Sequence, residues 1–203
     1  ERCAEITFLL ISMLRSSGIQ AEPVILSTRS NGKIQDLYPI VSQFNYVVAQ
    51  VKIGDKIFYV DATNPFRPIN VLPQKILNVR GLVIREENPE WVNISTTNTN
   101  SDTTGVNINL NSDGTVNVGF EDMFGNYLSL STRDDIGDKT DLEFFNEYYE
   151  PESLGFVVDS AKVLNKNNIE EPLKIQAGMS SENYSQTGGD MIYLKDRKST
   201  RLN

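Results

Sequence analysis

Cys3 is the one cysteine of this 203-residue chain and the residue best suited to covalent chemistry. It opens the stretch CAEITFLLISMLRS, which has the apolar spacing of a helix. Unpaired backbone N–H groups at the start of a helix stabilise a thiolate, the form in which cysteine acts as a nucleophile. Arg2 acts in the same direction, whereas the carboxylate of Glu5 opposes it. Two interpretations follow: a nucleophile, or the commoner small cysteine packed among apolar side chains.

A nucleophilic thiol is normally activated by a nearby base, yet this sequence contains no histidine. Asp61, at the end of a predicted pair of strands, is the type of residue that orients such a base. With no histidine and one cysteine, the sequence does not support a zinc site. The stretch NSDG (residues 111–114) lacks the remaining ligands of a calcium loop, so we expect a plain turn there, and no metal or other cofactor.

The elements around these residues predict an α+β fold for the first part of the chain. A helix from Ala4 to the left-handed Gly18 carries a stripe that should pack on the core: Ile6, Leu9, Leu10, Met13 and Leu14. A strand at 22–28, a hairpin of strands at 46–53 and 56–61, and a short apolar segment at 81–84 follow. We therefore expect a helix packed on an antiparallel sheet, in a domain covering residues 1–90.

Three motifs carry a specific resemblance: CAEI (residues 3–6), FNYV (44–47) and VDATNP (60–65). In order, spacing and flanking residues they resemble the transglutaminase-like superfamily. That superfamily is similar to papain-like enzymes, with a cysteine at a helix start and a histidine and an aspartate on adjacent strands. The resemblance implies that Cys3 is the nucleophile and that Asp61 orients the base, while Tyr46 stands where the histidine is expected.

Tyr46 changes what the resemblance implies about activity. A tyrosine hydroxyl has an ordinary pKa near 10, against about 6.5 for histidine, so it stays protonated at neutral pH and does not take the thiol proton. General acid–base catalysis typically contributes roughly 10²- to 10⁴-fold in rate. We therefore expect Tyr46 to bond to Asp61 and the site to be catalytically degenerate. Only the Cys3 backbone N–H can be named as an oxyanion donor.

The second part of the chain predicts a mostly β domain, residues 91–195, with one inserted helix. A polar linker is expected at 96–104, followed by alternating strands around the turn at Ser112–Gly114 and a capped helix from Thr140 to Pro151. Strand-like runs then begin at residues 156, 173 and 191. Residues 64–66 (NPF) favour a turn over a pocket wall, and Trp91 favours packing at the domain edge over ligand binding.

The two ends of the chain do not look native. The first residues lack a lead-in, so we expect an N-terminal truncation. The last eight, DRKSTRLN (196–203), translate GATCGGAAGAGCACACGTCTGAAC, which looks like a sequencing adaptor. This tail holds three basic residues and one acidic residue, so the rest of the chain carries a net charge of −10 instead of −8. Such an acidic chain, without a basic patch evident in the sequence, argues against nucleic-acid binding, and it has no transmembrane segment.

Three functions remain open from the sequence. The first is a degenerate transglutaminase-like domain that serves as a binding or scaffolding module for a protein or peptide in the bacterial cell envelope, a location implied by the resemblance alone. The second is a cysteine-dependent acyl transferase or peptidase that uses Cys3 with Asp61 and Tyr46, or with a base from the missing N-terminal segment. The third is a carbohydrate- or protein-binding surface on the β-rich domain.

Overall fold

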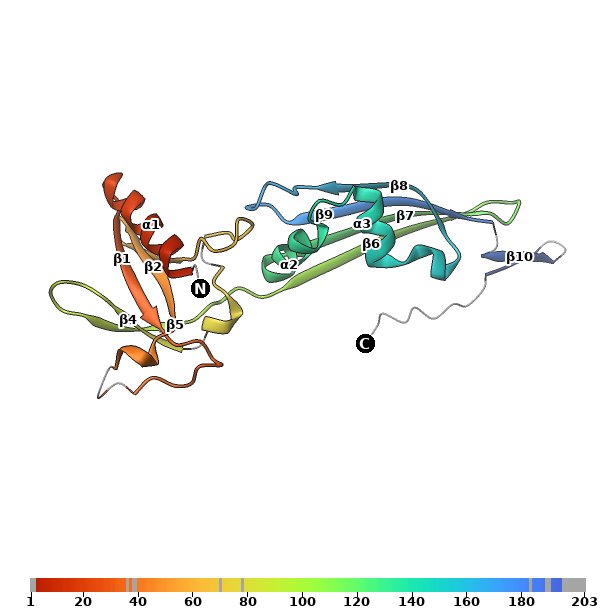
Figure 1. Ribbon diagram of the computed structural model, residues 1–203. Coiled ribbons are helices and arrows are strands. Elements are labelled where there is room, and N and C mark those ends of the chain that lie inside the picture. The colour runs from red at the N-terminus through yellow and green to blue at the C-terminus, as the bar shows by residue number, and fades with distance from the viewer. Residues whose placement is uncertain are drawn as a thin grey trace. The chain divides into compact units, whose positions relative to one another are not determined.

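The computed structural model describes residues 3–35, 37, 40–69, 71–77, 79–182, 184–188 and 191–194. They form two compact units that divide between Thr99 and Asn100, each containing helices and an antiparallel sheet (Figure 1). The predicted α+β class is confirmed at this level. Arg2 and the predicted adaptor tail lie outside the described residues.

The first unit is built on a five-stranded antiparallel sheet in the order β3-β2-β1-β4-β5. The strands are β1 (Gln20–Leu26), β2 (Tyr46–Ile53), β3 (Lys56–Val60), β4 (Val79–Val83) and β5 (Glu90–Ile94). The predicted hairpin at Gly54 and Asp55 joins β2 to β3, and Gly54 has the positive φ of 59° that such a turn uses. Two short 3-10 turns, η1 (Val41–Gln43) and η2 (Gln74–Ile76), lie in the connections.

Helix α1 (Cys3–Ser16) packs on β1 and β2, and it ends as predicted at Gly18, whose φ is 78°. The face that it buries differs from the predicted stripe. Thr7 and Ile11 are buried, with Leu10 and Leu14 partly buried beside them. The Thr7 hydroxyl donates to the backbone oxygen of Val47 (3.2 Å). The face of α1 that packs on the sheet is therefore rotated toward Thr7, relative to the predicted stripe.

That rotation leaves part of the predicted stripe in solvent. Leu9 and Met13 are 62% and 61% exposed, and Ile6 and Phe8 are also exposed. The predicted packing of Ile6, Leu9 and Met13 on the core is therefore wrong. Helical spacing identifies an apolar face, but the sheet decides which flank of that face is covered.

The first unit extends further along the chain than the predicted boundary at residue 90. Strand β5 pairs with β4 from Glu90 to Ile94, and Ile94 is fully buried. Trp91 lies on β5, where Phe44 stacks against it with ring centroids 6.4 Å apart. Trp91 therefore packs inside the first unit, and residues 91–99 belong with the first sheet.

The second unit is built on a four-stranded antiparallel sheet in the order β6-β7-β9-β8. Its strands are β6 (Ser101–Leu110), β7 (Val116–Gly125), β8 (Val157–Leu164) and β9 (Leu173–Ser181). A separate hairpin pairs β10 (Ser185–Gly188) with β11 (Met191–Leu194). The predicted linker is thus partly wrong, since residues 101–104 belong to β6.

Two helices accompany this sheet, α2 (Asn126–Ile136) and α3 (Asp141–Tyr149), with a 3-10 turn η3 (Pro151–Leu154) after them. Helix α3 starts with the predicted capping box between Thr140 and Glu143. Helix α2 was not predicted, so the expectation of a single inserted helix is wrong. Its sequence, NYLSLSTRDDI, is rich in polar residues and has no side-chain cap.

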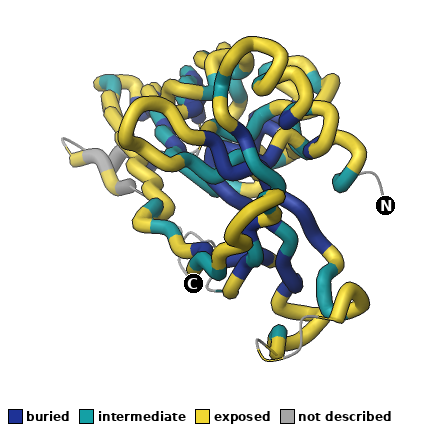
Figure 2. The backbone as a smooth tube through the Cα atoms, turned by 90° about the vertical axis from the view of Figure 1, so that its left-hand side faces the viewer, coloured by how far each residue is buried: buried dark blue, intermediate teal, exposed yellow. Residues whose placement is uncertain are grey.

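The core of the second unit lies between the sheet and the two helices. Phe144 and Phe145 of α3 and Ile136 of α2 pack on the buried face of β7 and β9. In Figure 2 the long buried stretches of the backbone lie in strands, although not every strand is buried. The hairpin at residues 106–120 was predicted to bury one face, and this is correct only for β7, where Val116 and Val118 are buried. The apolar side chains of the edge strand β6 are 41–55% exposed.

No helix in the described part of the chain has the length and apolar character needed to cross a membrane.

Candidate functional site

The three predicted site residues come from neighbouring elements of the first unit. Cys3 is the first residue of α1, Tyr46 the first residue of β2, and Asp61 follows the last residue of β3. Thr7, one turn after Cys3, bonds to Val47, and this anchors the start of the helix beside the start of β2. The structure thus gathers all three residues at one end of the β2–β3 hairpin.

The start of β2 is fixed by Asn45, which precedes Tyr46. Its backbone N–H donates to the Leu26 oxygen (3.1 Å), and its side-chain oxygen accepts the backbone N–H of Thr28 (2.8 Å). Its side-chain amide donates to the Thr28 hydroxyl (2.9 Å). These bonds tie the residue before β2 to the end of β1 and so fix where Tyr46 begins the strand.

Tyr46 and Asp61 form a buried hydrogen bond. The tyrosine hydroxyl donates to Oδ2 of Asp61 at 2.7 Å, as the sequence suggests, and the two residues are only 5% and 4% exposed. The hydroxyl of Thr63 also lies 3.4 Å from the Tyr46 oxygen. The phenol therefore uses its proton in a bond to the carboxylate.

The second oxygen of Asp61 is also fully engaged. It accepts the backbone N–H of Thr63 (2.8 Å) and the Thr63 hydroxyl. Nε of Arg67 lies 4.0 Å away, in an ion pair whose side chains are 10% and 0% exposed. This Nε is buried and makes no hydrogen bond, while the Arg67 Nη1 donates to the Val71 oxygen (3.3 Å). Asp61 is therefore held by three side chains, and its charge is partly balanced by Arg67.

Burial raises the pKa of Tyr46 far above its usual range, and the hydrogen bond and negative charge of Asp61 raise it further. The hydrogen bond from Thr63 acts in the opposite direction but is outweighed. A negative charge on Cys3 adds to the rise, which shows that the two side chains are within electrostatic reach of each other. A phenol held protonated in this way is not a base for the Cys3 thiol.

Sequence reasoning missed two cations of this site. Arg67 faces Asp61, and the Nζ of Lys75, on η2, lies 4.4 Å from the centroid of the Tyr46 ring. A cation over an aromatic face is attracted by the ring's negative quadrupole. Neither contact has a signal in the sequence, because both residues reach the site from loops whose paths only the folded chain defines.

The other candidate residues near the site have structural roles. The side-chain oxygen of Asn64 accepts the backbone N–H of Phe66 (2.7 Å), and the backbone N–H of Arg67 donates to the Asn64 oxygen (3.2 Å). The predicted turn at residues 64–66 is thus confirmed. That turn also delivers Arg67 to Asp61.

The residues described here offer no built metal site. No cluster of three acidic, histidine or cysteine side chains that could hold a metal occurs among them. The carboxylate of Asp113, the weak calcium candidate, accepts the backbone N–H (2.9 Å) and the hydroxyl (2.7 Å) of Thr115. Hydrogen bonds from Thr115 also lower the pKa of Asp113, as expected of a carboxylate in a turn.

Cys3 is a free cysteine and is partly exposed. The groups described around it supply a neutral phenol and an engaged carboxylate, but no proton acceptor of neutral pKa. Among the described residues the arrangement thus places a partly exposed thiol near a phenol that is bonded to a carboxylate. Comparison of the chain with protein-family models, curated proteins and solved structures gives no match.

Proposed function

We propose that the first unit is a transglutaminase-like domain that has lost its proton-transfer chemistry, and that the protein is a binding or scaffolding module of the bacterial cell envelope. The observation that carries the proposal is the buried 2.7 Å bond from Tyr46 to Asp61. It occupies the place where a catalytic domain of this kind would hold an imidazole between the thiol and the carboxylate.

The arrangement of elements supports the transglutaminase-like part of the proposal. A helix that starts with cysteine packs on an antiparallel sheet, one strand of that sheet begins with Tyr46, and the next is followed by Asp61. This is the order and placement that the CAEI, FNYV and VDATNP motifs imply. The envelope location rests on the same resemblance.

The environment of Tyr46 supports the loss of catalysis. A base must exchange protons near the working pH, whereas the pKa of Tyr46 is raised by burial and by Asp61. The carboxylate is occupied by Tyr46 and Thr63 and faces Arg67. A carboxylate with both oxygens bonded in this way is stable as it stands, which suits a domain that binds a protein or peptide without turning it over.

The test is the rate at which iodoacetamide alkylates Cys3 at pH 7, compared with an unstructured peptide containing one cysteine. We expect a rate within about threefold of the peptide for the native chain. Tyr46→His should raise it about tenfold or more, because an imidazole beside a thiol holds it as thiolate. Tyr59→His, on β3, serves as the matched control and should leave the rate unchanged.

Tyr46→Phe keeps the ring and removes the hydroxyl, and it distinguishes the proposal from the alternative enzyme. If Tyr46 takes no part in activating the thiol, the phenylalanine variant is alkylated at the native rate. A native chain that reacts far faster than the peptide, and loses that advantage in Tyr46→Phe, would contradict the proposal. That result would favour a cysteine-dependent acyl transferase or peptidase.

A further inference from the structure

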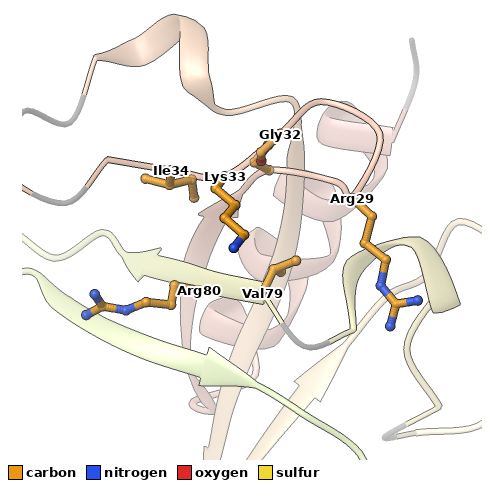
Figure 3. A pocket seen from close by; sticks show the side chains of 7 residues that line it. Arg29, Gly32, Lys33, Ile34, Val79 and Arg80 are labelled. Atoms are coloured by element: carbon orange, nitrogen blue, oxygen red, sulfur yellow. The ribbon is translucent and has the colours of Figure 1, made fainter.

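A second site of the first unit lies away from Cys3, Tyr46 and Asp61. A pocket of about 340 Å³ opens between the loop after β1 and the first residues of β4 (Figure 3). Its lining residues are Ser27, Arg29, Gly32, Lys33, Ile34, Val79 and Arg80. Its volume is at the lower end of the range of small-molecule sites, roughly 300–1,000 Å³.

The charge of this pocket is opposite to that of the chain. The whole sequence has 27 acidic and 19 basic residues, yet three of the seven described lining residues are basic and none is acidic. The sequence alone suggests no basic patch, because Arg29 and Lys33 lie 51 and 47 positions before Arg80. The pairing of β1 with β4 brings them together.

The loop that forms one wall is fixed by its own hydrogen bonds. The buried Ser27 hydroxyl donates to the Gly32 oxygen (2.8 Å) and accepts the side-chain amide of Asn31 (3.1 Å). Gly32 adopts a φ of 104°, a backbone conformation that residues other than glycine rarely adopt. These contacts close the loop on itself and present Lys33 from a defined position.

The two arginines are held at the sides of the pocket. Arg29 donates from Nε to the Leu77 oxygen (3.0 Å) and from its backbone N–H to the Lys75 oxygen (2.9 Å). The guanidinium of Arg80 lies 5.1 Å from the centroid of the Trp91 ring. Because protein contacts already orient both side chains, a ligand would not have to order them.

Lys33 is the cation left for a ligand. Its ammonium group makes no hydrogen bond or ion pair with the described residues. In Figure 3 its side chain extends across the pocket toward Val79, with Ile34 beside it, while Arg29 and Arg80 extend on either side. The Lys33 ammonium thus lies near the apolar side chains of Ile34 and Val79.

We propose that this pocket binds a small organic anion. Its carboxylate or phosphate group pairs with the Lys33 ammonium, flanked by Arg29 and Arg80, and its apolar body rests on Ile34 and Val79. The basic side chains lie at the rim, so the ion pair is solvated and the affinity is moderate. None of the residues of the Cys3–Tyr46–Asp61 site lines the pocket, so this inference does not depend on the proposed function.

The test is titration of the ¹⁵N-labelled chain with phenyl phosphate, followed by the amide shifts of Gly32, Lys33, Val79 and Arg80. We expect saturable shifts at these positions, with a Kd that rises as salt is added. Inorganic phosphate, which lacks the apolar body, should bind at least about fivefold more weakly. Benzyl alcohol, which lacks the charge, should leave the shifts unchanged.

Lys33→Met keeps the side-chain length and removes the charge, and it should weaken phenyl phosphate binding about tenfold. Lys56→Met, on β3 at the opposite edge of the sheet, makes the same change away from the pocket and should bind as the native chain does. Equal affinity in native chain and Lys33→Met would overturn the proposal. So would phosphate binding as tightly as phenyl phosphate, or shifts spread over other amides only.

Discussion

The two units each contain a tyrosine bonded to a buried aspartate, and the two pairs share their hydrogen bonds; Tyr46 is buried, whereas Tyr149 is partly exposed. In the first unit Tyr46 donates to Oδ2 of Asp61 at 2.7 Å, and in the second Tyr149 donates to Oδ2 of Asp122, also at 2.7 Å. A threonine hydroxyl donates to the other carboxylate oxygen in both cases, from Thr63 and from Thr104. Burial is the largest cause that raises the pKa of each tyrosine.

The pairs differ in what surrounds the carboxylate. Asp61 faces the buried Arg67, and its tyrosine has Lys75 over the ring and Cys3 within electrostatic reach. Asp122 instead has the carboxyl of Asp102 close enough to raise the pKa of Asp102. A tyrosine–aspartate pair is therefore a structural unit that this chain uses twice. Its presence next to a cysteine is no evidence of catalysis by itself.

Replacing each aspartate by alanine should give the largest difference in stability between the two pairs. Asp61→Ala leaves the Arg67 guanidinium buried without its counter-charge, and we expect the first unit to lose about 3 kcal/mol of unfolding free energy. Asp122→Ala removes a hydrogen-bond acceptor but also relieves repulsion with Asp102, so the second unit should lose only about 1 kcal/mol.

Denaturant unfolding can follow the units separately. The chain has one tryptophan, Trp91, which lies in the first unit, so its fluorescence reports that unit alone. The tyrosine cluster around Tyr148 and Tyr149 gives the second unit a near-ultraviolet circular dichroism signal. Equal losses of unfolding free energy in Asp61→Ala and Asp122→Ala would show that Arg67 and Asp102 do not affect the stability of the two pairs.

A smaller effect should appear in the pH dependence of the second unit. The pKa of Asp102 is raised by partial desolvation of its carboxyl and by the neighbouring carboxylate of Asp122. A raised pKa in the folded state means that the proton stabilises the fold: the contribution is complete below the unfolded pKa of about 3.9 and is lost as pH rises through the folded value.

Asp102→Asn should abolish this contribution. The native second unit should lose stability relative to the variant as pH rises from about 4 to 7, and circular dichroism melts at several pH values measure it. Asp102 is exposed, so solvent screening keeps the difference small. Parallel melting curves for the two proteins across this range would contradict a raised pKa of Asp102.

Helix ends and turns that have a local signal in the sequence were predicted correctly from it. Gly18 ends α1, the turn at Gly54 joins β2 to β3, and the capping box of Thr140 and Glu143 starts α3. Each depends on residues close in sequence, so spacing alone is sufficient. The hydrogen bond between Tyr46 and Asp61 was also expected, because the hairpin sets both ends of it.

Features fixed by distant contacts were missed. Helix α2 depends on the fully buried Arg133, whose guanidinium donates to the backbone oxygens of Asn165, Lys166, Asn168 and Glu171. The sequence NYLSLSTRDDI gives no signal of these contacts, because the loop lies 32 to 38 residues further along the chain. The contacts of Arg67 and Lys75 with the first pair also join residues that are distant in sequence, and so does the packing that sets the rotation of α1 on its sheet.

The most direct measurement of the central claim is the ionisation of Tyr46, followed by the ¹³Cζ shift of labelled tyrosine in the native chain and in Tyr46→Phe, which assigns the signal. If Tyr46 is a structural donor to Asp61, its signal stays that of a neutral phenol up to about pH 11, beyond the ordinary tyrosine pKa near 10. An ionisation of Tyr46 below about pH 9 that parallels a rise in Cys3 alkylation would contradict it and make the site a working cysteine centre.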